Sequence, residues 1–234
     1  MTEGGAGLNF EVVEGVFIKE LKNRFLCEVK IENQVEVCYV SSSCHLSNFL
    51  DLRGKRVLLT SIVGKKARTR YSVFAVAHKR SYIILNPSLA NKVVSKSIHT
   101  KRFSFLGKRN IIESEYTIDN YKSDIFIPKS KTVIEIKSLI SLDSVAIFPT
   151  VYSERMERQL KELISLSGKG FDSYIFIVSL NPYVKKICLN SSNKSYDYLC
   201  SCLKAGVKIR AFSLIFKDNK LKVKRELPVM YESV

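Results

Sequence analysis

Residues 123–137 have the sequence SDIFIPKSKTVIEIK, and this stretch decides how the second half of the chain is interpreted. Two apolar, β-prone runs flank the turn-like segment 128–131, which predicts a β-hairpin. Such a hairpin brings Asp124 near Glu135 and Lys137. Because side chains alternate between the two faces of a strand, Glu135 and Lys137 share one face. The stretch therefore predicts two carboxylates and one lysine at the same place on a sheet.

This trio predicts metal-assisted phosphodiester hydrolysis, with Asp124, Glu135 and Lys137 as the catalytic residues. The carboxylates would hold a hard divalent cation, Mg²⁺ or Mn²⁺. The cation would polarise a phosphate and lower the pKa of the attacking water. Lys137 would orient that water and offset developing negative charge. The alternative is a solvated hairpin, since the same spacing also arises by chance.

The composition predicts a folded protein with a polyanionic partner. Of the 234 residues, 46% are hydrophobic, which is enough for a sizeable core, and the net charge is +16. Such a charge favours binding to phosphates through counterion release. No acidic residue occurs between Asp51 and Glu113. That interval contains fifteen basic residues: Arg53, Lys55, Arg56, Lys65, Lys66, Arg68, Arg70, Lys79, Arg80, Lys92, Lys96, Lys101, Arg102, Lys108 and Arg109. A basic, solubilising face is the competing interpretation.

Several other classes of protein are not supported by the sequence. The three histidines are far apart, and neither a P-loop nor a G-x-G-x-x-G motif is present. The six cysteines contain no C-x-x-C pair. The apolar runs fall short of the roughly 18 residues that span a bilayer, and the start lacks signal-peptide features. We therefore expect a cytoplasmic protein with free thiols and no membrane partner.

The first part of the chain predicts a small β-barrel. Residues 1–9 are glycine-rich and are expected to form a mobile N-terminus. Residues 10–80 contain five short β-prone runs, which are typical of an OB-like barrel. The runs are 11–19, 25–31, 35–40, 56–62 and 71–77. OB-folds bind single strands in basic grooves, and the loop 64–71 contains Lys65, Lys66, Arg68 and Arg70 beside a tyrosine. A flexible basic hairpin tip is the alternative.

Residues 81–234 predict a mixed α/β domain with the order αβββαβ. Asn86 and Pro87 are suited to start a helix, and helical periodicity continues to about residue 98. Three strands are predicted at 110–117, 122–127 and 132–137, a helix at 154–167 and a buried strand at 174–178. This order is that of restriction-endonuclease-like domains, whose acidic residues lie on the second and third strands. Asp124 and Glu135 fall at those positions.

The chain resembles the sugar fermentation stimulation protein A family from about Gly15 to Val229. The resemblance is carried by 22–29 (KNRFLCEV), 89–94 (LANKVV), 123–126 (SDIF), 134–138 (IEIKS), 148–150 (FPT), 153–155 (SER) and 227–229 (LPV). It implies an OB-fold joined to a nuclease-like domain. It also implies a DNA-binding protein linked to the regulation of sugar metabolism, for which nuclease activity is inferred.

The resemblance also implies roles for individual residues. Asp124 and Glu135 match the metal-binding carboxylates, Lys137 matches the catalytic lysine, and Glu115 falls where an acidic residue could add a metal contact. The alternative for Glu115 is a solvated strand residue. Two further sets are expected to contact nucleic acid, DNA rather than RNA: Arg155 and Gln159 on the helix, and Arg24, Lys65, Lys66, Arg68 and Arg70 in the barrel. A homodimer is compatible with this interpretation.

The chain departs from the family pattern at three places. Residues 41–44 replace a Pro-Asn-Thr-Gly stretch, Thr150 replaces an aspartate, and Gln159 stands where histidine is frequent. Three hypotheses remain open, the weakest of which is a module that binds ribosomal or other ribonucleoprotein complexes. The first is a divalent-metal-dependent nuclease. The second is a non-catalytic DNA-binding regulator that retains the nuclease fold.

Overall fold

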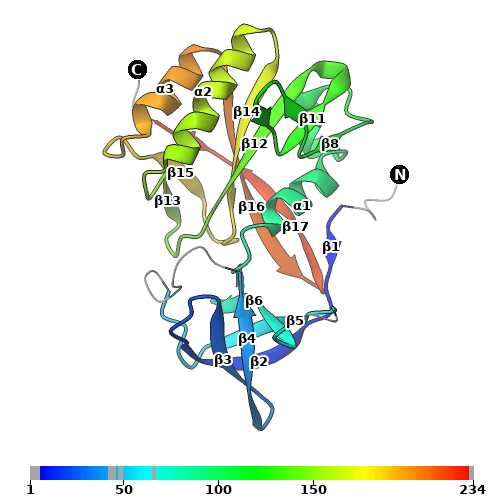
Figure 1. Ribbon diagram of the computed structural model, residues 1–234, viewed down its shortest axis with the longest axis vertical. Helices are drawn as coiled ribbons and strands as arrows, with labels where there is room; N and C mark the ends of the chain where they lie inside the picture. The colour runs from blue at the N-terminus through cyan, green and yellow to red at the C-terminus, as the bar shows by residue number, and fades with distance from the viewer. Residues whose placement is uncertain (1–5, 42–45, 47–49, 65–66, 232–234) are drawn as a thin grey trace.

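The computed structural model describes residues 6–41, 46, 50–64 and 67–231. A β-barrel lies at one end of the long axis and an α/β domain at the other (Figure 1). This arrangement confirms the predicted mixed α/β class, with the barrel first in the chain. No helix within the described ranges combines the length and the apolarity that crossing a membrane requires.

Five strands form the closed, OB-like barrel: β2 (Val13–Glu20), β3 (Leu26–Ile31), β4 (Gln34–Val40), β5 (Arg56–Ser61) and β6 (Tyr71–His78). They pair in the order β4-β3-β2-β5-β6, and a parallel β4–β6 pairing closes the barrel. Gly15 on β2 allows a close approach, because a Cβ there would lie 2.6 Å from Val29 Cγ1. β7 (Ser81–Ile84) pairs with β6, so the barrel sheet continues past the boundary expected at residue 80.

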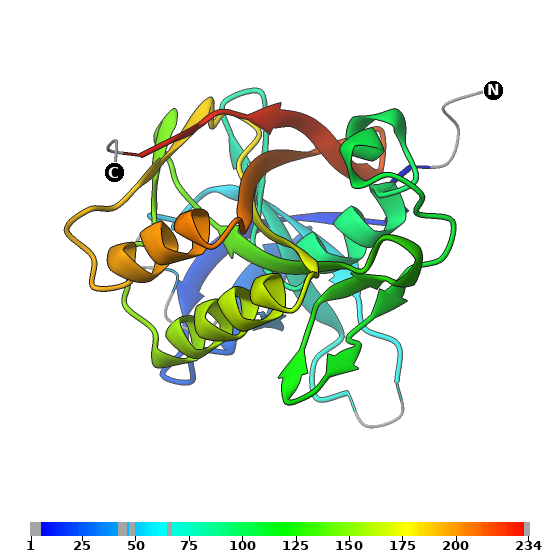
Figure 2. The same cartoon turned by 90° about the horizontal axis from the view of Figure 1, so that it is seen from above.

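The α/β domain is built on a seven-stranded sheet with the order β1-β17-β16-β14-β12-β11-β8. Its elements are α1 (Leu89–Ser97), β8 (Glu113–Ser114), β11 (Ile125–Ile127), β12 (Thr132–Leu139), α2 (Glu154–Gly168), β14 (Asp172–Ser179), α3 (Tyr196–Lys204), β16 (Lys208–Lys217) and β17 (Lys220–Leu227). The order α1-β8-β11-β12-α2-β14 is the predicted αβββαβ core. α1 covers one face of the sheet, and α2 and α3 cover the other (Figure 2).

Burial explains why the central strands are continuous apolar runs. β12, β14 and β16 are parallel neighbours with helices on both faces. Phe176 and Phe212 face the α1 side, where they pack with Phe103 of the 3₁₀ helix Lys101–Leu106. Ile175 and Ile177 face α2 and α3. β12, the strand that contains Lys137, is therefore packed on both of its faces.

The structure differs from the sequence expectations in three places. Leu8 and Asn9 form β1, which pairs with β17, so the predicted mobile segment 1–9 is not wholly outside the fold. The predicted strand 110–117 is reduced to β8, because the backbone turns at Glu115 with a φ of 55°. A separate hairpin follows, formed by β9 (Thr117–Ile118) and β10 (Tyr121–Lys122). A small parallel sheet of β13 (Val145–Phe148), β15 (Lys186–Leu189) and β18 (Val229–Met230) was not anticipated.

Candidate active site

The hairpin predicted from residues 123–137 is present and fixes the position of Asp124. β11 and β12 are antiparallel, with Ile125 opposite Ile134 and Ile127 opposite Thr132. The turn between them is a short 3₁₀ helix, Pro128–Ser130. This register brings Asp124 to the strand that contains Glu135, and the Ile136 amide donates to Asp124 Oδ2 at 2.6 Å.

Glu135 is the centre of a buried polar cluster. The residue is only 2% exposed. Its Oε1 accepts hydrogen bonds from Lys137 Nζ at 2.7 Å and Gln159 Nε2 at 2.6 Å. Its Oε2 accepts a hydrogen bond from the Tyr121 hydroxyl. Lys137 Nζ also donates to Gln159 Oε1 at 2.6 Å. These partners offset the cost of removing a carboxylate from water.

Asp124 is held in a fixed orientation but is electrostatically disfavoured. Asn91 on α1 donates to its Oδ1 at 2.6 Å. Burial, and after it the charge of Glu135, raise the pKa of the Asp124 carboxyl, whose net value is about 6. The Ile136 amide, Lys137 and Asn91 oppose this shift without cancelling it. Two neighbouring carboxylates in a partly dehydrated site form an environment that a cation would stabilise.

Tyr121 is positioned to act as a hydrogen-bond donor. β10 places its side chain in the interior, where it is 4% exposed. Burial, followed by the nearby Glu135 charge, raises the pKa of the Tyr121 hydroxyl well above its usual range. The hydroxyl therefore stays protonated and donates a hydrogen bond to Glu135 Oε2.

The cluster opens into a cleft of about 400 Å³ between the β9–β10 region and α2. The strand side contributes Glu115, Asn120, Tyr121, Lys122, Ser123 and Asp124, and the helix side contributes Arg155, Arg158, Gln159 and Glu162. The spacing i, i+3, i+4, i+7 places these four helix residues on one face of α2. The opposite face is buried through Met156, Leu160 and Leu163. Ser153 caps the helix start by accepting from the Met156 amide at 3.3 Å.

Two of the predicted nucleic-acid contacts, Arg155 and Gln159, therefore lie in the cleft. Gln159 also forms hydrogen bonds with both Glu135 and Lys137. The structure does not bring Glu115 into the carboxylate pair. Glu115 is exposed and forms a 2.6 Å ion pair with Lys122, whose hydrogen bond lowers the pKa of the Glu115 carboxyl. Within the described part of the chain, His, Cys, Asp and Glu form no group of three or more suited to a metal ion.

The described basic residues predicted in the barrel, Arg24, Arg68 and Arg70, are not part of the cleft lining. Arg24 and Arg70 stack over neighbouring aromatic rings, at 4.8 Å from Phe25 and 5.1 Å from Tyr71. Arg68 is exposed, and Lys65 and Lys66 lie outside the described residues.

Two arginines of the long basic stretch have structural partners. Arg109 donates to the carbonyls of Ile98 at 2.5 Å, Thr100 at 2.8 Å and Gly107 at 2.8 Å, which ties together the segment after α1. Arg102 donates to the Lys224 carbonyl at 3.1 Å. Some of the positive charge in this stretch therefore stabilises the fold through hydrogen bonds to backbone carbonyls.

Asn91 and Tyr121 are site residues that were not predicted from the sequence. Asn91 lies within the segment 89–94 that contributed to the family resemblance, and this was the available signal. Tyr121 had no comparable signal, because its role depends on the β9–β10 hairpin folding over the sheet.

An OB-type barrel followed by a restriction-endonuclease-like domain, with a carboxylate pair and a lysine on its central hairpin, defines the class of this chain. Two family models match the chain, and the boundary between them lies between β7 and α1, where the barrel meets the α/β domain. The model described as "SfsA N-terminal OB domain" matches residues 21–85, and "Sugar fermentation stimulation protein RE domain" matches residues 88–220. The chain belongs to the sugar fermentation stimulation protein family.

Relatives cover nearly the whole chain. The sugar fermentation stimulation protein homolog of Thermotoga sp. (strain RQ2) is 28% identical over 225 residues, covering 94% of this chain and 96% of the relative. The homolog of Ruminiclostridium cellulolyticum is 23% identical, covering 93% and 97%. The solved structure of Pyrococcus furiosus SfsA in complex with Ca²⁺ matches with a TM-score of 0.82 and 24% identity, covering 96% of this chain and 99% of that one. This likeness establishes the shared fold.

Proposed function

We propose that this protein is a nucleic-acid-binding nuclease that hydrolyses phosphodiester bonds with the help of a divalent cation. The observation that carries the proposal is that the partly buried Asp124 and Lys137 adjoin the buried Glu135, beside a cleft whose lining includes Asp124 and two arginines. DNA is the favoured substrate over RNA. The net charge of +16 supports a polyanionic ligand of either kind.

The donor set fits a hard cation such as Mg²⁺ or Mn²⁺. The carboxylates of Asp124 and Glu135 supply oxygen ligands, and carboxylate oxygens retain further lone pairs after accepting hydrogen bonds. Burial and the neighbouring Glu135 charge raise the pKa of Asp124, so a bound cation would offset the repulsion between the two carboxylates. The Ca²⁺ in the Pyrococcus furiosus SfsA structure supports a divalent-ion site in this fold. When bound, the cation would polarise the phosphate and activate water.

The chain's own residues divide the remaining work. Lys137 Nζ is fixed between Glu135 and Gln159, so its charge is directed at the site without a large loss of side-chain entropy on binding. Arg155 and Arg158 on the cleft wall would hold the phosphate backbone. Gln159 acts as a positioning residue for Glu135 and Lys137.

The proposal is tested with labelled single- and double-stranded DNA and RNA in Mg²⁺, Mn²⁺ or EDTA. We expect cleavage that requires a divalent ion and stops in EDTA. Absence of cleavage on all four substrates with both metals, while binding persists, would contradict the nuclease.

A second candidate is a non-catalytic, DNA-binding regulator. It is favoured by one observation: each oxygen of the Asp124 and Glu135 carboxylates already accepts a hydrogen bond from the protein. Such a regulator would bind nucleic acid with strong salt dependence. Its binding would be unchanged in Asp124→Ala, and no metal would alter it.

The role of Gln159 gives a separate prediction. Gln159→Leu keeps the approximate size of the side chain but removes its bonds to Glu135 and Lys137. Partners of metal-binding groups typically contribute 10- to 100-fold, so we expect metal-dependent cleavage to fall by about that factor. A metal titration of the cleavage rate measures it. Arg158→Leu, on the same helix face, is the matched variant: it should weaken substrate binding and leave the metal dependence unchanged.

A further inference from the structure

The outer surface of the barrel has an exposed pair of stacked aromatic rings. On β3 and β4, Cys27 and Cys38 point inward and are fully buried. Tyr39 points outward, and Phe25 lies next to it just before β3; each is 37% exposed. Their ring centroids are 6.3 Å apart with an interplanar angle of 12°. Both residues are exposed, and neither belongs to the buried cluster of the barrel.

Two arginines flank the aromatic pair. The Arg24 guanidinium lies 4.8 Å from the Phe25 ring centroid. On the other side, Tyr39 is in register with Ser72 of β6. Arg70 lies two residues before Ser72, just ahead of β6, and is exposed, with its guanidinium 5.1 Å from the Tyr71 ring centroid. We call the row Arg24, Phe25, Tyr39 and Arg70 the aromatic row.

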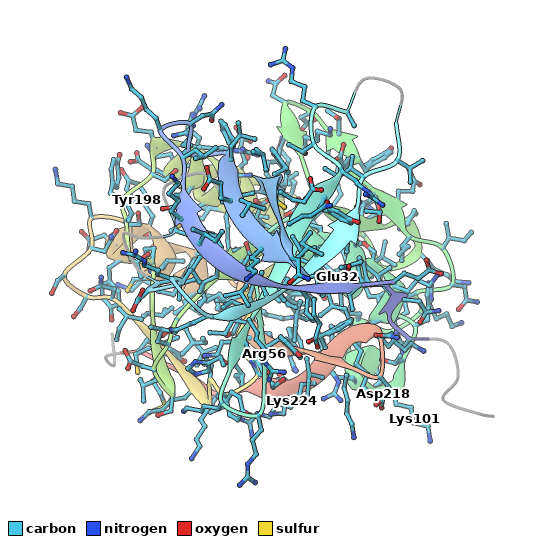
Figure 3. The ribbon with its side chains drawn as sticks, turned by 90° about the horizontal axis from the view of Figure 1, so that it is seen from below. Glu32, Arg56, Lys101, Tyr198, Asp218 and Lys224 are labelled. Atoms are coloured by element: carbon cyan, nitrogen blue, oxygen red, sulfur yellow. The ribbon has the colours of Figure 1, made fainter. Side chains whose placement is uncertain are left out.

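The aromatic row lies at the end of the barrel nearest the α/β domain. The β3–β4 hairpin turns at Glu32, which Figure 3 labels, and Figure 1 shows this hairpin pointing away from the α/β domain. Phe25 and Tyr39 are at the opposite end of the same two strands, where Leu26 pairs with Tyr39. A ligand on the row could therefore continue toward the second domain.

We propose that the aromatic row is a platform on which the unpaired bases of a single-stranded nucleic acid stack, with Arg24 and Arg70 contacting phosphates. This rests on the proposed function for the kind of ligand and adds the strandedness and the residues. Aromatic side chains bind bases of any sequence through their ring faces, which a duplex conceals between its own base pairs. The row lies on the barrel strands and connecting loops that OB-folds use for oligonucleotides.

Charge favours nucleic acid over a protein partner. The neighbouring Val35 and Val37 are 58% and 43% exposed, so the surface is partly apolar. A protein partner would bury those valines and could also use the arginines, but the phosphates of a nucleic-acid strand would place negative charge beside both of them. In a chain with a net charge of +16, the combination of open rings and flanking cations matches a polyanion with ring-shaped groups.

The test uses the absence of tryptophan from the chain. Tyr39→Trp places a single reporter in the row. Tyr198→Trp is the control, because Tyr198 lies on α3 with Lys161 over its ring at 5.0 Å, so it has a similar cation but no role in the proposal. The tryptophan fluorescence of both variants is titrated in EDTA with a twelve-nucleotide oligothymidine and with a duplex of the same length. We expect strong quenching of the Tyr39→Trp signal by the single strand alone, and none in the control.

Binding affinity gives an independent readout. Phe25→Leu and Tyr39→Leu should each weaken single-strand binding about 10-fold or more, and duplex binding by less than about 2-fold. Equal quenching by the duplex, or no quenching at all, would overturn the proposal. A concentration-dependent dimer that Tyr39→Leu abolishes would overturn it in favour of a protein interface. Because EDTA prevents cleavage, a failed nuclease assay leaves this result unaffected, and the two proposals fail separately.

Discussion

Glu135→Gln is expected to lower the rate of metal-dependent cleavage by about 10³-fold while leaving nucleic-acid binding intact. Glutamine has the same shape, so one amide oxygen can still accept from Lys137 and Gln159. What it removes is the negative charge, which is both a cation ligand and the partner of the lysine. Removing one group that stabilises transition-state charge typically costs about 10²–10³-fold, and loss of the cation adds to this.

A matched carboxylate makes this result specific. Glu115→Gln removes the same charge from another residue of the cleft lining, but Glu115 is exposed and forms an ion pair with Lys122. The cleavage rate of the Glu115→Gln variant should stay within about 3-fold of the wild-type rate, as for other surface substitutions. Initial rates under saturating Mg²⁺, with affinity measured separately in EDTA, provide the comparison. Equal loss in both variants would show that general electrostatics, and not the Glu135 site, controls cleavage.

The parts of the site that were predictable from the sequence are those defined by local periodicity. The hairpin of β11 and β12 follows from two apolar runs and a turn containing Pro128, and its register then places Asp124 beside Glu135. The face of α2 that contains Arg155 and Gln159 follows from helical spacing. In both cases the sequence separation between partners is short, so the pattern specifies the contact.

The residues that were missed depend on distant contacts. Asn91 reaches Asp124 from α1, 33 residues away, and no local pattern links them. Tyr121 reaches Glu135 only because Glu115 adopts a positive φ, which ends β8 and lets the next hairpin fold over the sheet. The backbone at Glu115 is unusual for a non-glycine residue, and propensity reasoning assigns such a position to a strand.

The small parallel sheet of β13, β15 and β18 was also not predictable from local sequence patterns. β13 and β15 have four residues each and pair across about forty positions of the chain. Short parallel strands of this kind have no alternating pattern of their own, and their pairing is determined by the tertiary fold. The distinction is physical: hairpins and helix faces are specified locally, and long-range pairings are not.

Asp124→Asn is expected to make the folded protein more stable at neutral pH, by about 1–3 kcal/mol, while abolishing cleavage. The folded pKa of Asp124 is about 6, above the ordinary value of 3.8. Each unit of such a shift corresponds to about 1.4 kcal/mol, and asparagine loses one of the two hydrogen bonds that the carboxylate accepts, which lowers the net gain. Without the negative charge, the protein no longer has the energetic cost of dehydrating it or of its repulsion from Glu135, which together cause the pKa shift. Loss of function accompanied by a gain in stability is the expected signature of a strained active site.

The pH dependence follows from the direction of the shift. Below about pH 4 the carboxyl is protonated in both states, and its contribution to wild-type stability is fully present. As the pH rises toward 6, the unfolded state loses its proton first, so wild-type stability declines relative to Asp124→Asn, and the difference is constant above about pH 6. Urea unfolding in EDTA from pH 4 to 8 measures this. Asp119→Asn, which removes an exposed carboxylate paired with Lys169, should show no such divergence.

A divalent cation should reverse the order of stability. A cation that binds only the folded protein adds about 4.1 kcal/mol at 1,000 times its dissociation constant, which exceeds the expected advantage of Asp124→Asn, and this gain requires the Asp124 charge. Protons compete for the same carboxylate, so the apparent metal affinity of the wild type should fall about 10-fold per pH unit below 6. Asp124→Asn should gain little from metal at any pH. If wild type and variant respond equally to Mg²⁺, the cation binds elsewhere, and the carboxylate pair is not the metal site.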